Sequence, residues 1–171
     1  MASGLVFATV GSTKFDSLVS NITQEDVLKA LKKRGYTNLK IQMGNGTTLP
    51  NKKNGEKVGI DITYYRYKDS IEHDIDEADL VVSHAGAGSC LEVLEKEKPL
   101  LVVINEELMH NHQRELADRL SAEGCIYACT PSTLCETIES MDLSRLEKFP
   151  KSDPSLFPNF LNKFMGFAKD E

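Results

Sequence analysis

The chain has 171 residues, the size of about one ordinary domain, and a chain of this length buries roughly 70% of its unfolded surface on folding. With 40% hydrophobic and 27% charged residues, the composition is typical of a water-soluble globular protein, and no stretch approaches the ~20 apolar residues of a membrane span. The formal net charge of −6 argues against nucleic-acid binding, which needs a basic face.

The N-terminus and the cysteines indicate a cytoplasmic protein. The first apolar run begins directly after Gly4, without the basic stretch and cleavage site of a signal peptide. The four cysteines are Cys90, Cys125, Cys129 and Cys135. Their spacing fits no metal pair or redox motif, so we predict reduced, mostly buried thiols. His110 and His112 would point to different faces of a helix, and no metal site is predicted.

In chain order, short apolar runs alternate with helical patterns. The predicted strands are residues 5–10, 39–43, 60–67, 80–83, 100–104 and 125–129. The predicted helices are residues 26–34, 71–77, 89–97, 111–123 and 134–141. The polar, glycine-bearing segment 51–59 is predicted to be a surface loop. This alternation predicts an α/β, Rossmann-like domain over residues 1–150, with a mostly parallel sheet covered by helices on both faces, and a helical tail over residues 151–171.

Ligands of such sheets bind at the carboxyl ends of the strands, where this sequence is rich in glycine and polar residues. The strongest signal is SHAGAGSCLE, residues 83–92, between a predicted strand and a helix. Gly86 and Gly88 allow close approach of the backbone to a ligand, and the helix N-terminus favours a phosphate. The helix dipole contributes only about 0.3–1 kcal/mol per charge, so His84 and Ser89 are expected to donate as well. Alternatively, Ser89 and Glu92 form a capping box that serves only the helix.

Two other ligand or reaction classes are disfavoured by the glycine spacing. The full G-x-G-x-x-G motif is absent after the first strand, where only Gly11 stands, and this argues against NAD binding. A hydrolase with Ser89 as nucleophile would need glycine two residues before and two residues after the serine (G-x-S-x-G). Ala87 and Leu91 stand at those positions. The phosphate-binding interpretation of residues 83–92 is therefore preferred.

The spacing of His84, Gly86, Ser89 and Glu92, followed by a strand and then His112, Gln113 and Ala117, resembles the sugar-nucleotide signature of GT-B glycosyltransferases. The segments VFATVGSTKFDSL, YRYKDSI, ADLVVSHAGAGSCLE, KPLLVVINEELMHNHQRELA and SMDLSRL are similar to one family in particular. Its members are the cytosolic catalytic subunits of the two-protein transferase that adds the second N-acetylglucosamine to dolichyl diphosphate-linked N-acetylglucosamine. The resemblance implies the C-terminal, donor-binding half of a GT-B enzyme.

The resemblance also implies a donor site for UDP-N-acetylglucosamine (UDP-GlcNAc). Its diphosphate would be surrounded by Gly11, Ser12, His84, Gly86, Gly88 and Ser89. Glu92 would accept hydrogen bonds from the ribose hydroxyls, and Tyr67 with the Lys68 backbone would hold uracil. For Tyr64, Tyr65 and Tyr67 the alternative is strand packing. His112 and Gln113 would contact the sugar, or form a solvated helix N-terminus, where Asn111 is either a ligand contact or an N-cap.

The same resemblance implies that the enzyme is completed by a second protein. The acceptor-binding domain and the general base are expected on a membrane-anchored partner, which would recruit this chain to the cytosolic face of the endoplasmic reticulum. No metal or cofactor is expected, because helix N-termini and hydrogen-bond donors would stabilise the departing UDP. The alternative is a stand-alone nucleotide-binding or regulatory module without its own chemistry.

The tail has an apolar stripe at helical spacing. It consists of Phe157, Phe160, Leu161, Phe164 and Ala168, with Phe167 beside it. The stripe is expected either to pack on the domain's own sheet or to dock the partner.

Overall fold

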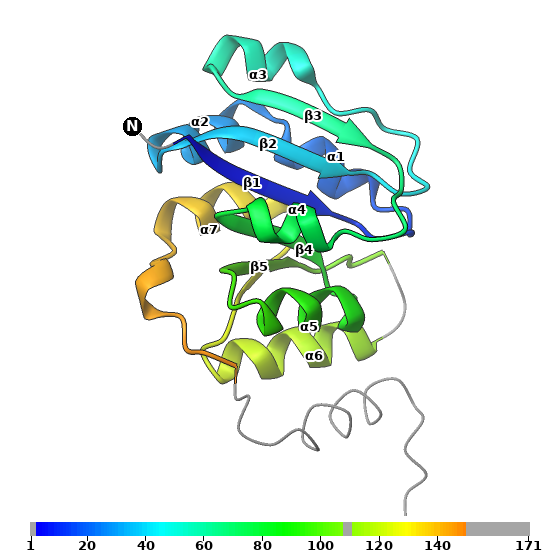
Figure 1. The fold of residues 1–171 in the computed structure, drawn as a ribbon, viewed down its shortest axis with the longest axis vertical. Helices are drawn as coiled ribbons and strands as arrows, with labels where there is room; N and C mark the ends of the chain where they lie inside the picture. Colours follow the sequence, from blue (N-terminus) through cyan, green and yellow to red (C-terminus); the bar gives the residue numbers. More distant parts are fainter. Residues whose placement is uncertain (1–2, 108–110, 150–171) are drawn as a thin grey trace, which may run out of the picture.

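The structure, a computed structural model, describes residues 3–107 and 111–149 and contains one parallel β-sheet (Figure 1). The strands are β1 (Gly4–Thr9), β2 (Tyr36–Gln42), β3 (Asp61–Tyr65), β4 (Leu80–His84), β5 (Leu100–Val103) and β6 (Tyr127–Cys129). They pair in the order β3-β2-β1-β4-β5-β6, and every neighbouring pair is parallel. The predicted Rossmann-like α/β fold is confirmed.

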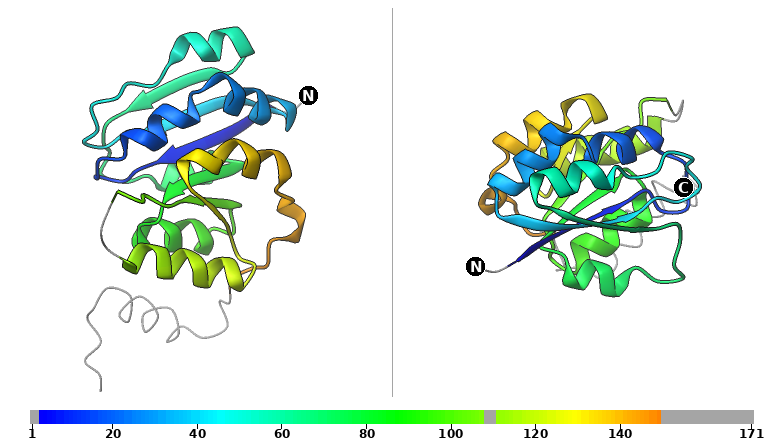
Figure 2. Two further views of the ribbon diagram at one scale, coloured as in Figure 1. Left: turned by 180° about the vertical axis from the view of Figure 1, so that it is seen from behind. Right: turned by 90° about the horizontal axis from the view of Figure 1, so that it is seen from above.

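Helices cover both faces of this sheet, as Figures 1 and 2 show from opposite sides. They are α1 (Asp16–Ile22), α2 (Glu25–Lys33), α3 (Lys52–Val58), α4 (Glu72–Glu77), α5 (Ala87–Glu95), α6 (Asn111–Ala122) and α7 (Leu134–Ser140). Helices α1, α2 and α7 pack on one face, whereas α4, α5 and α6 pack on the other. Two short 3-10 turns, Pro131–Thr133 and Leu143–Arg145, flank α7.

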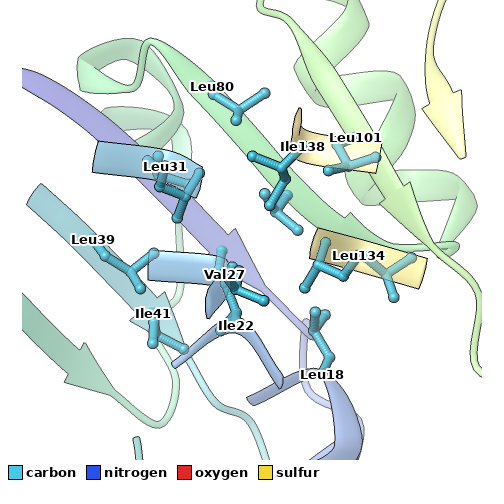
Figure 3. Close-up of a cluster of buried hydrophobic side chains, with 14 of the residues drawn as sticks. Leu18, Ile22, Val27, Leu31, Leu39, Ile41, Leu80, Leu101, Leu134 and Ile138 are labelled. Carbon is cyan, nitrogen blue, oxygen red and sulfur yellow. The ribbon is translucent and has the colours of Figure 1, made fainter. Parts of the chain in front are cut away.

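Each face of the sheet carries its own apolar core, because helices exclude water from both sides of the parallel strands. Figure 3 shows the first core, in which side chains of α1, α2 and α7 meet those of the strands. Its labelled members are Leu18, Ile22, Val27, Leu31, Leu39, Ile41, Leu80, Leu101, Leu134 and Ile138. The second core contains Phe7 of β1 together with Ile75, Val93 and Leu120 of α4, α5 and α6. This double burial explains why β1, β4 and β5 are recognisable in the sequence as continuous apolar runs.

Two helices differ from the prediction. The segment 51–59, predicted to be a loop, contains α3; the Asn51 side chain accepts a hydrogen bond from the Asn54 backbone N–H, and Gly59 ends the helix in the left-handed conformation. Val58 of α3 packs against the first core, which stabilises a helix with weak intrinsic propensity. Helix α1 was not predicted, because its seven residues are too few to show a clear helical period.

The packing of α2 allows a test of the first core. Leu31 is fully buried there, so Leu31→Ala should lower the free energy of unfolding by about 2–5 kcal/mol, through lost apolar burial and the cavity left behind. Urea denaturation followed by circular dichroism measures this change. Lys33→Ala, on the exposed side of the same helix, is the control and should change stability by less than about 0.5 kcal/mol. Equal effects would contradict the assigned packing.

Candidate functional site

A groove lies at the carboxyl ends of the strands, on the side of the sheet covered by α4 and α5. It encloses about 210 Å³. Its lining consists of Gly11, Gln42, Tyr67, Lys68, Asp69, Ser70, Ile71, Ser89 and Glu92. Gly11 follows β1, Gln42 ends β2, residues 67–71 follow β3, and Ser89 and Glu92 lie in the first two turns of α5. Segments distant in sequence therefore meet at one edge of the sheet. This is where ligands of open parallel sheets bind.

Helix α5 points its N-terminus toward this edge. It begins at Ala87 with Gly86 as the N-cap, two residues earlier than predicted, and no side chain caps it. Ser89 is therefore the third residue of the helix, and the capping-box interpretation of Ser89 and Glu92 is wrong. The first backbone N–H groups of a helix have no intrahelical partner and attract anions. Of the residues in this first turn, Ser89 lines the groove.

His84, the last residue of β4, is buried between two glycine-containing loops with only 8% of its surface exposed. A β-carbon at Gly86 would lie 2.3 Å from its Nε2 atom, and one at Gly11 would lie 2.9 Å from its Cε1 atom. Both glycines therefore make room for the imidazole. Burial lowers the pKa of His84, and the nearby Thr9 backbone opposes this only in part. Its buried Nδ1 atom has no hydrogen-bond partner among the described residues.

Glu92 lies in the second turn of α5 and presents a carboxylate to the groove. Partial burial raises its pKa, and the negative charge of Glu72 raises it further, while Lys96 opposes the shift. Within residues 3–107 and 111–149, its side chain makes no hydrogen bond or ion pair with another residue. A carboxylate so placed is ready to accept hydrogen bonds from hydroxyl groups of a ligand.

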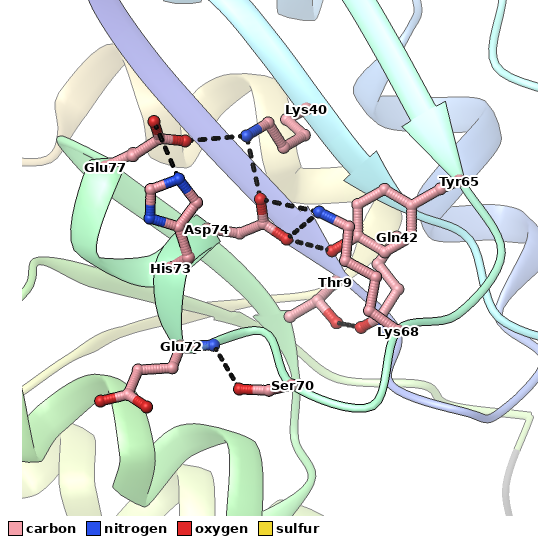
Figure 4. Close-up of polar contacts among 10 residues, drawn as sticks. All are labelled: Thr9, Lys40, Gln42, Tyr65, Lys68, Ser70, Glu72, His73, Asp74 and Glu77. Carbon is pink, nitrogen blue, oxygen red and sulfur yellow. Dashed lines mark hydrogen bonds and ion pairs between the residues drawn. The ribbon is translucent and has the colours of Figure 1, made fainter.

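A buried carboxylate, Asp74 of α4, fixes the loop that forms one wall of the groove (Figure 4). It accepts hydrogen bonds from the Tyr65 hydroxyl, from Lys40 Nζ at 2.9 Å and from Lys68 Nζ at 2.9 Å. Lys68 Nζ also lies 4.2 Å from the centre of the Tyr65 ring. Burial by itself raises the pKa of Asp74, but the hydrogen bonds from Tyr65, Lys40 and Lys68 outweigh it and hold the pKa at about 2. The ammonium of Lys68 is thus tied to the domain.

Gln42, at the end of β2, is a groove residue that the sequence analysis missed. Its Oε1 atom accepts a hydrogen bond from the Thr9 hydroxyl, also drawn in Figure 4. A glutamine inside a strand gives no signal of its own in a single sequence. The only available indication was a polar side chain one residue before the end of the predicted strand 39–43.

The predicted site residues are not all at the groove. Gly11, Tyr67, Ser89 and Glu92 line it, while His84 lies beside Gly11 and Gly86 lies on the other side of His84. Ser12 is exposed, and its carbonyl accepts a hydrogen bond from Asn45 Nδ2. Gly88 is exposed in the first turn of α5, and a β-carbon there would meet no atom of the described residues within 4 Å.

His112 and Gln113 lie in the first turn of α6, outside the residues that line the groove. His112 is exposed and Gln113 is partly buried. The predicted apolar stripe of the tail, and the tail itself, lie outside the described residues.

Within residues 3–107 and 111–149, no cluster of three or more His, Cys, Asp or Glu side chains could hold a metal ion. No helix there has the length and apolar character needed to cross a bilayer. The cysteines of this part are unpaired thiols, and Cys90, Cys125 and Cys129 are buried, as predicted.

Comparison with known proteins agrees with this geometry. The model of the glycosyltransferase family 28 C-terminal domain matches residues 5–169. The chain belongs to this family. Among solved structures, the family 28 domain described here is similar to an NMR structure of ALG13, with a TM-score of 0.68, 24% identity and 95% of both chains covered. It is also similar to Acinetobacter baumannii MurG, with a TM-score of 0.66 and 17% identity, over 96% of this chain and 50% of that one. These likenesses show the fold.

Curated relatives extend the comparison. The UDP-N-acetylglucosamine transferase subunit ALG13 of Homo sapiens is 54% identical over 125 residues, covering 73% of this chain and 11% of that protein. The protein of the same name from Mus musculus is 52% identical over 124 residues, covering 72% and 10%. The Saccharomyces cerevisiae protein of that name is 29% identical over 188 residues, covering 91% and 93%. The chain thus spans about a tenth of the length of the two mammalian relatives. These names agree with the transferase family that the motifs resemble.

The hydrogen bonds that Asp74 accepts from Tyr65, Lys40 and Lys68 predict a pH dependence of stability for this family 28 domain. The pKa of Asp74 falls from the usual 3.8 to about 2, so its ionised form stabilises the folded state by about 2 kcal/mol above the unfolded pKa. That stability is lost as the pH falls from about 4 to about 2. Asp74→Asn should lower the free energy of unfolding at neutral pH by about 2 kcal/mol and remove this part of the acid dependence.

Urea denaturation of the wild type and the variant across this pH range measures the effect. Asp61→Asn is a matched control, because Asp61 is exposed on β3 and makes no hydrogen bond with another described side chain. An Asp74→Asn protein with the acid profile of the wild type would contradict the assignment.

Proposed function

We propose that this chain is the donor-binding, catalytic subunit of a transferase that moves N-acetylglucosamine from UDP-GlcNAc to dolichyl-diphosphate-GlcNAc, giving the chitobiosyl lipid of N-linked glycosylation. The observation that carries the proposal is the groove, which is lined by Ser89 in the uncapped first turn of α5 and by Glu92, with the buried His84 next to Gly11 of its lining. Membership of glycosyltransferase family 28 and the names of the curated relatives support the choice of donor.

The diphosphate of the donor binds at the first turn of α5. There the backbone N–H groups of Gly88 and Ser89, together with the Ser89 hydroxyl, donate to phosphate oxygens. Gly11 and Ser12 approach the diphosphate from the end of β1, and His84 lies between Gly11 and Gly86. Because burial favours the neutral imidazole, His84 is available to gain a proton when the anionic diphosphate arrives next to it.

The uridine half occupies the rest of the groove. Glu92 accepts hydrogen bonds from the ribose hydroxyls, which suits a carboxylate with two oxygens and no other partner in the described chain. Uracil lies against the loop that begins at Tyr67. The side chain of Lys68 is held by Asp74, so the Lys68 backbone is the part of that residue free to contact the base.

In the reaction, the acceptor hydroxyl attacks the anomeric carbon from the face opposite the leaving group, a C–O bond forms, and the bond to the UDP oxygen breaks with inversion. His112 and Gln113 bind hydroxyls of the sugar. The chain's part in catalysis is to stabilise the negative charge that develops on the departing UDP through fixed N–H dipoles, without a metal ion. The general base that takes the acceptor proton belongs to the partner.

The partner is a membrane-anchored subunit that supplies the acceptor site and recruits this chain from the cytoplasm to the endoplasmic reticulum. Co-expression with a candidate partner in membranes tests this directly. Chitobiosyl lipid should form from UDP-GlcNAc only when both proteins are present. A chain that binds donor but never supports transfer with any membrane fraction would instead be a stand-alone nucleotide-binding module.

Titration of the isotopically labelled chain with UDP-GlcNAc, followed by NMR, tests the donor site. Shifts should concentrate at Gly11, Gly88, Glu92 and Gln113, and UDP-glucose and NAD should bind more weakly. Glu92→Ala should weaken UDP binding by about tenfold, as expected for the loss of hydrogen bonds to a charged group. The control ligand is 2′,3′-dideoxyuridine diphosphate, whose affinity should be the same for the wild type and the variant. A stronger response to NAD would refute the proposal.

A substitution at Gly88 is expected to affect stability and donor binding in opposite directions. Gly88→Ala replaces a helical glycine by the best helix former and meets open space, so it should raise the free energy of unfolding by about 0.5–1 kcal/mol. The added methyl group would stand where the diphosphate approaches the backbone, and it should lower UDP affinity. Thermal unfolding and the same NMR titration measure the two effects. A variant that is more stable and binds UDP normally would argue against a diphosphate at this turn.

A further inference from the structure

Gln42 has an unusual environment for a carboxamide. It ends β2, lies on the same face of the strand as Lys40, and is 98% buried, since only 2% of its surface is exposed. It nevertheless lines the groove, between Gly11 on one side and the segment from Tyr67 to Ile71 on the other. A polar side chain so deeply buried needs hydrogen-bond partners, because an unpaired amide in a protein interior is costly.

A short chain of hydrogen bonds fixes the orientation of this carboxamide. The Thr9 hydroxyl accepts a hydrogen bond from the Gly11 backbone N–H at 3.0 Å and donates its own proton to Gln42 Oε1 at 2.5 Å. The Oε1 atom of Gln42 is therefore already engaged in a hydrogen bond with the Thr9 hydroxyl. Its Nε2 amino group makes no hydrogen bond with any residue of the described chain. Gln42 thus offers the groove a group that only donates.

The acceptor that fits this donor is on the base of the nucleotide. In the proposed function, on which this inference rests, the phosphates lie at α5 and the ribose hydroxyls donate to Glu92. The carbonyl oxygens of uracil are then the strong acceptors of the uridine half that neither α5 nor Glu92 engages. We propose that Gln42 is a specificity-determining residue that donates a hydrogen bond from Nε2 to a carbonyl oxygen of uracil.

Two substitutions separate a ligand contact from a purely structural role. Gln42→Met keeps the approximate volume but loses both the groove-facing amino group and the acceptor of Thr9. Gln42→Glu keeps an oxygen for the Thr9 hydroxyl and replaces the amino group by a second oxygen. Gln24→Glu, at an exposed position before α2, adds the same charge away from the groove and is the matched control. Thermal unfolding shows whether each variant is folded.

The full chain and each variant are titrated with UMP and with ribose 5-phosphate, which lacks the base, and the dissociation constants are measured by NMR. Both Gln42 variants should bind UMP about tenfold more weakly than the wild type, and ribose 5-phosphate should bind equally to all of them. The neutral Gln42→Met variant shows that the loss does not depend on the charge introduced by Gln42→Glu.

Each other outcome overturns the inference in a recognisable way. If Gln42→Glu binds UMP normally and only Gln42→Met is impaired, Gln42 merely positions Thr9 and Gly11. If ribose 5-phosphate loses as much affinity as UMP, the contact is not to the base. If the wild type and both variants bind UMP equally well, the inference fails while the proposed donor site stands. If the wild type binds neither UMP nor UDP-GlcNAc, the proposed function fails, and this inference fails with it.

Discussion

The reversal of strand order at β1 is the constraint on which the rest of the molecule depends. From β1 the chain moves outward through β2 to β3 with its helices on one face, and then crosses to β4 and moves the other way through β5 to β6 with its helices on the opposite face. Right-handed crossovers require this change of face. The loops that leave β1 and β4 therefore diverge, and the groove opens between them at the carboxyl edge.

Polar side chains buried beneath the groove hold its backbone in place. Thr9 links the Gly11 backbone to Gln42, and Asp74 ties the β3–α4 loop to β2 through Lys40 and Lys68. Such groups are costly to bury without partners, so each satisfied bond fixes one geometry of the surrounding chain. The groove is thus preorganised by contacts that a ligand does not have to make.

Large hydrophobic side chains are exposed in the loops that follow β2 and β3. Tyr67 at its rim is 61% exposed, and Leu49, in the loop that follows β2, is 59% exposed. In the proposed enzyme, the donor lies in a half-open site until the acceptor-binding subunit covers it. Closure would exclude water from the reacting centre and strengthen the interactions with the departing diphosphate. In the proposed enzyme, this division would place recognition of the donor in one chain and activation of the acceptor in the other.

The sequence by itself determined the fold class, the succession of strands and helices along the chain and the loop between β4 and α5, because strands buried on both faces are apolar runs and glycines mark the turn. It also pointed to Glu92 and His84 through their spacing in one segment. It could not reveal α3, whose stability depends on packing, nor Gln42 and Asp74. Those two acquire their roles from partners 33 and 34 residues away in sequence, Thr9 and Lys40. Only tertiary structure, which buries a polar group and then supplies its partner, decides such contacts.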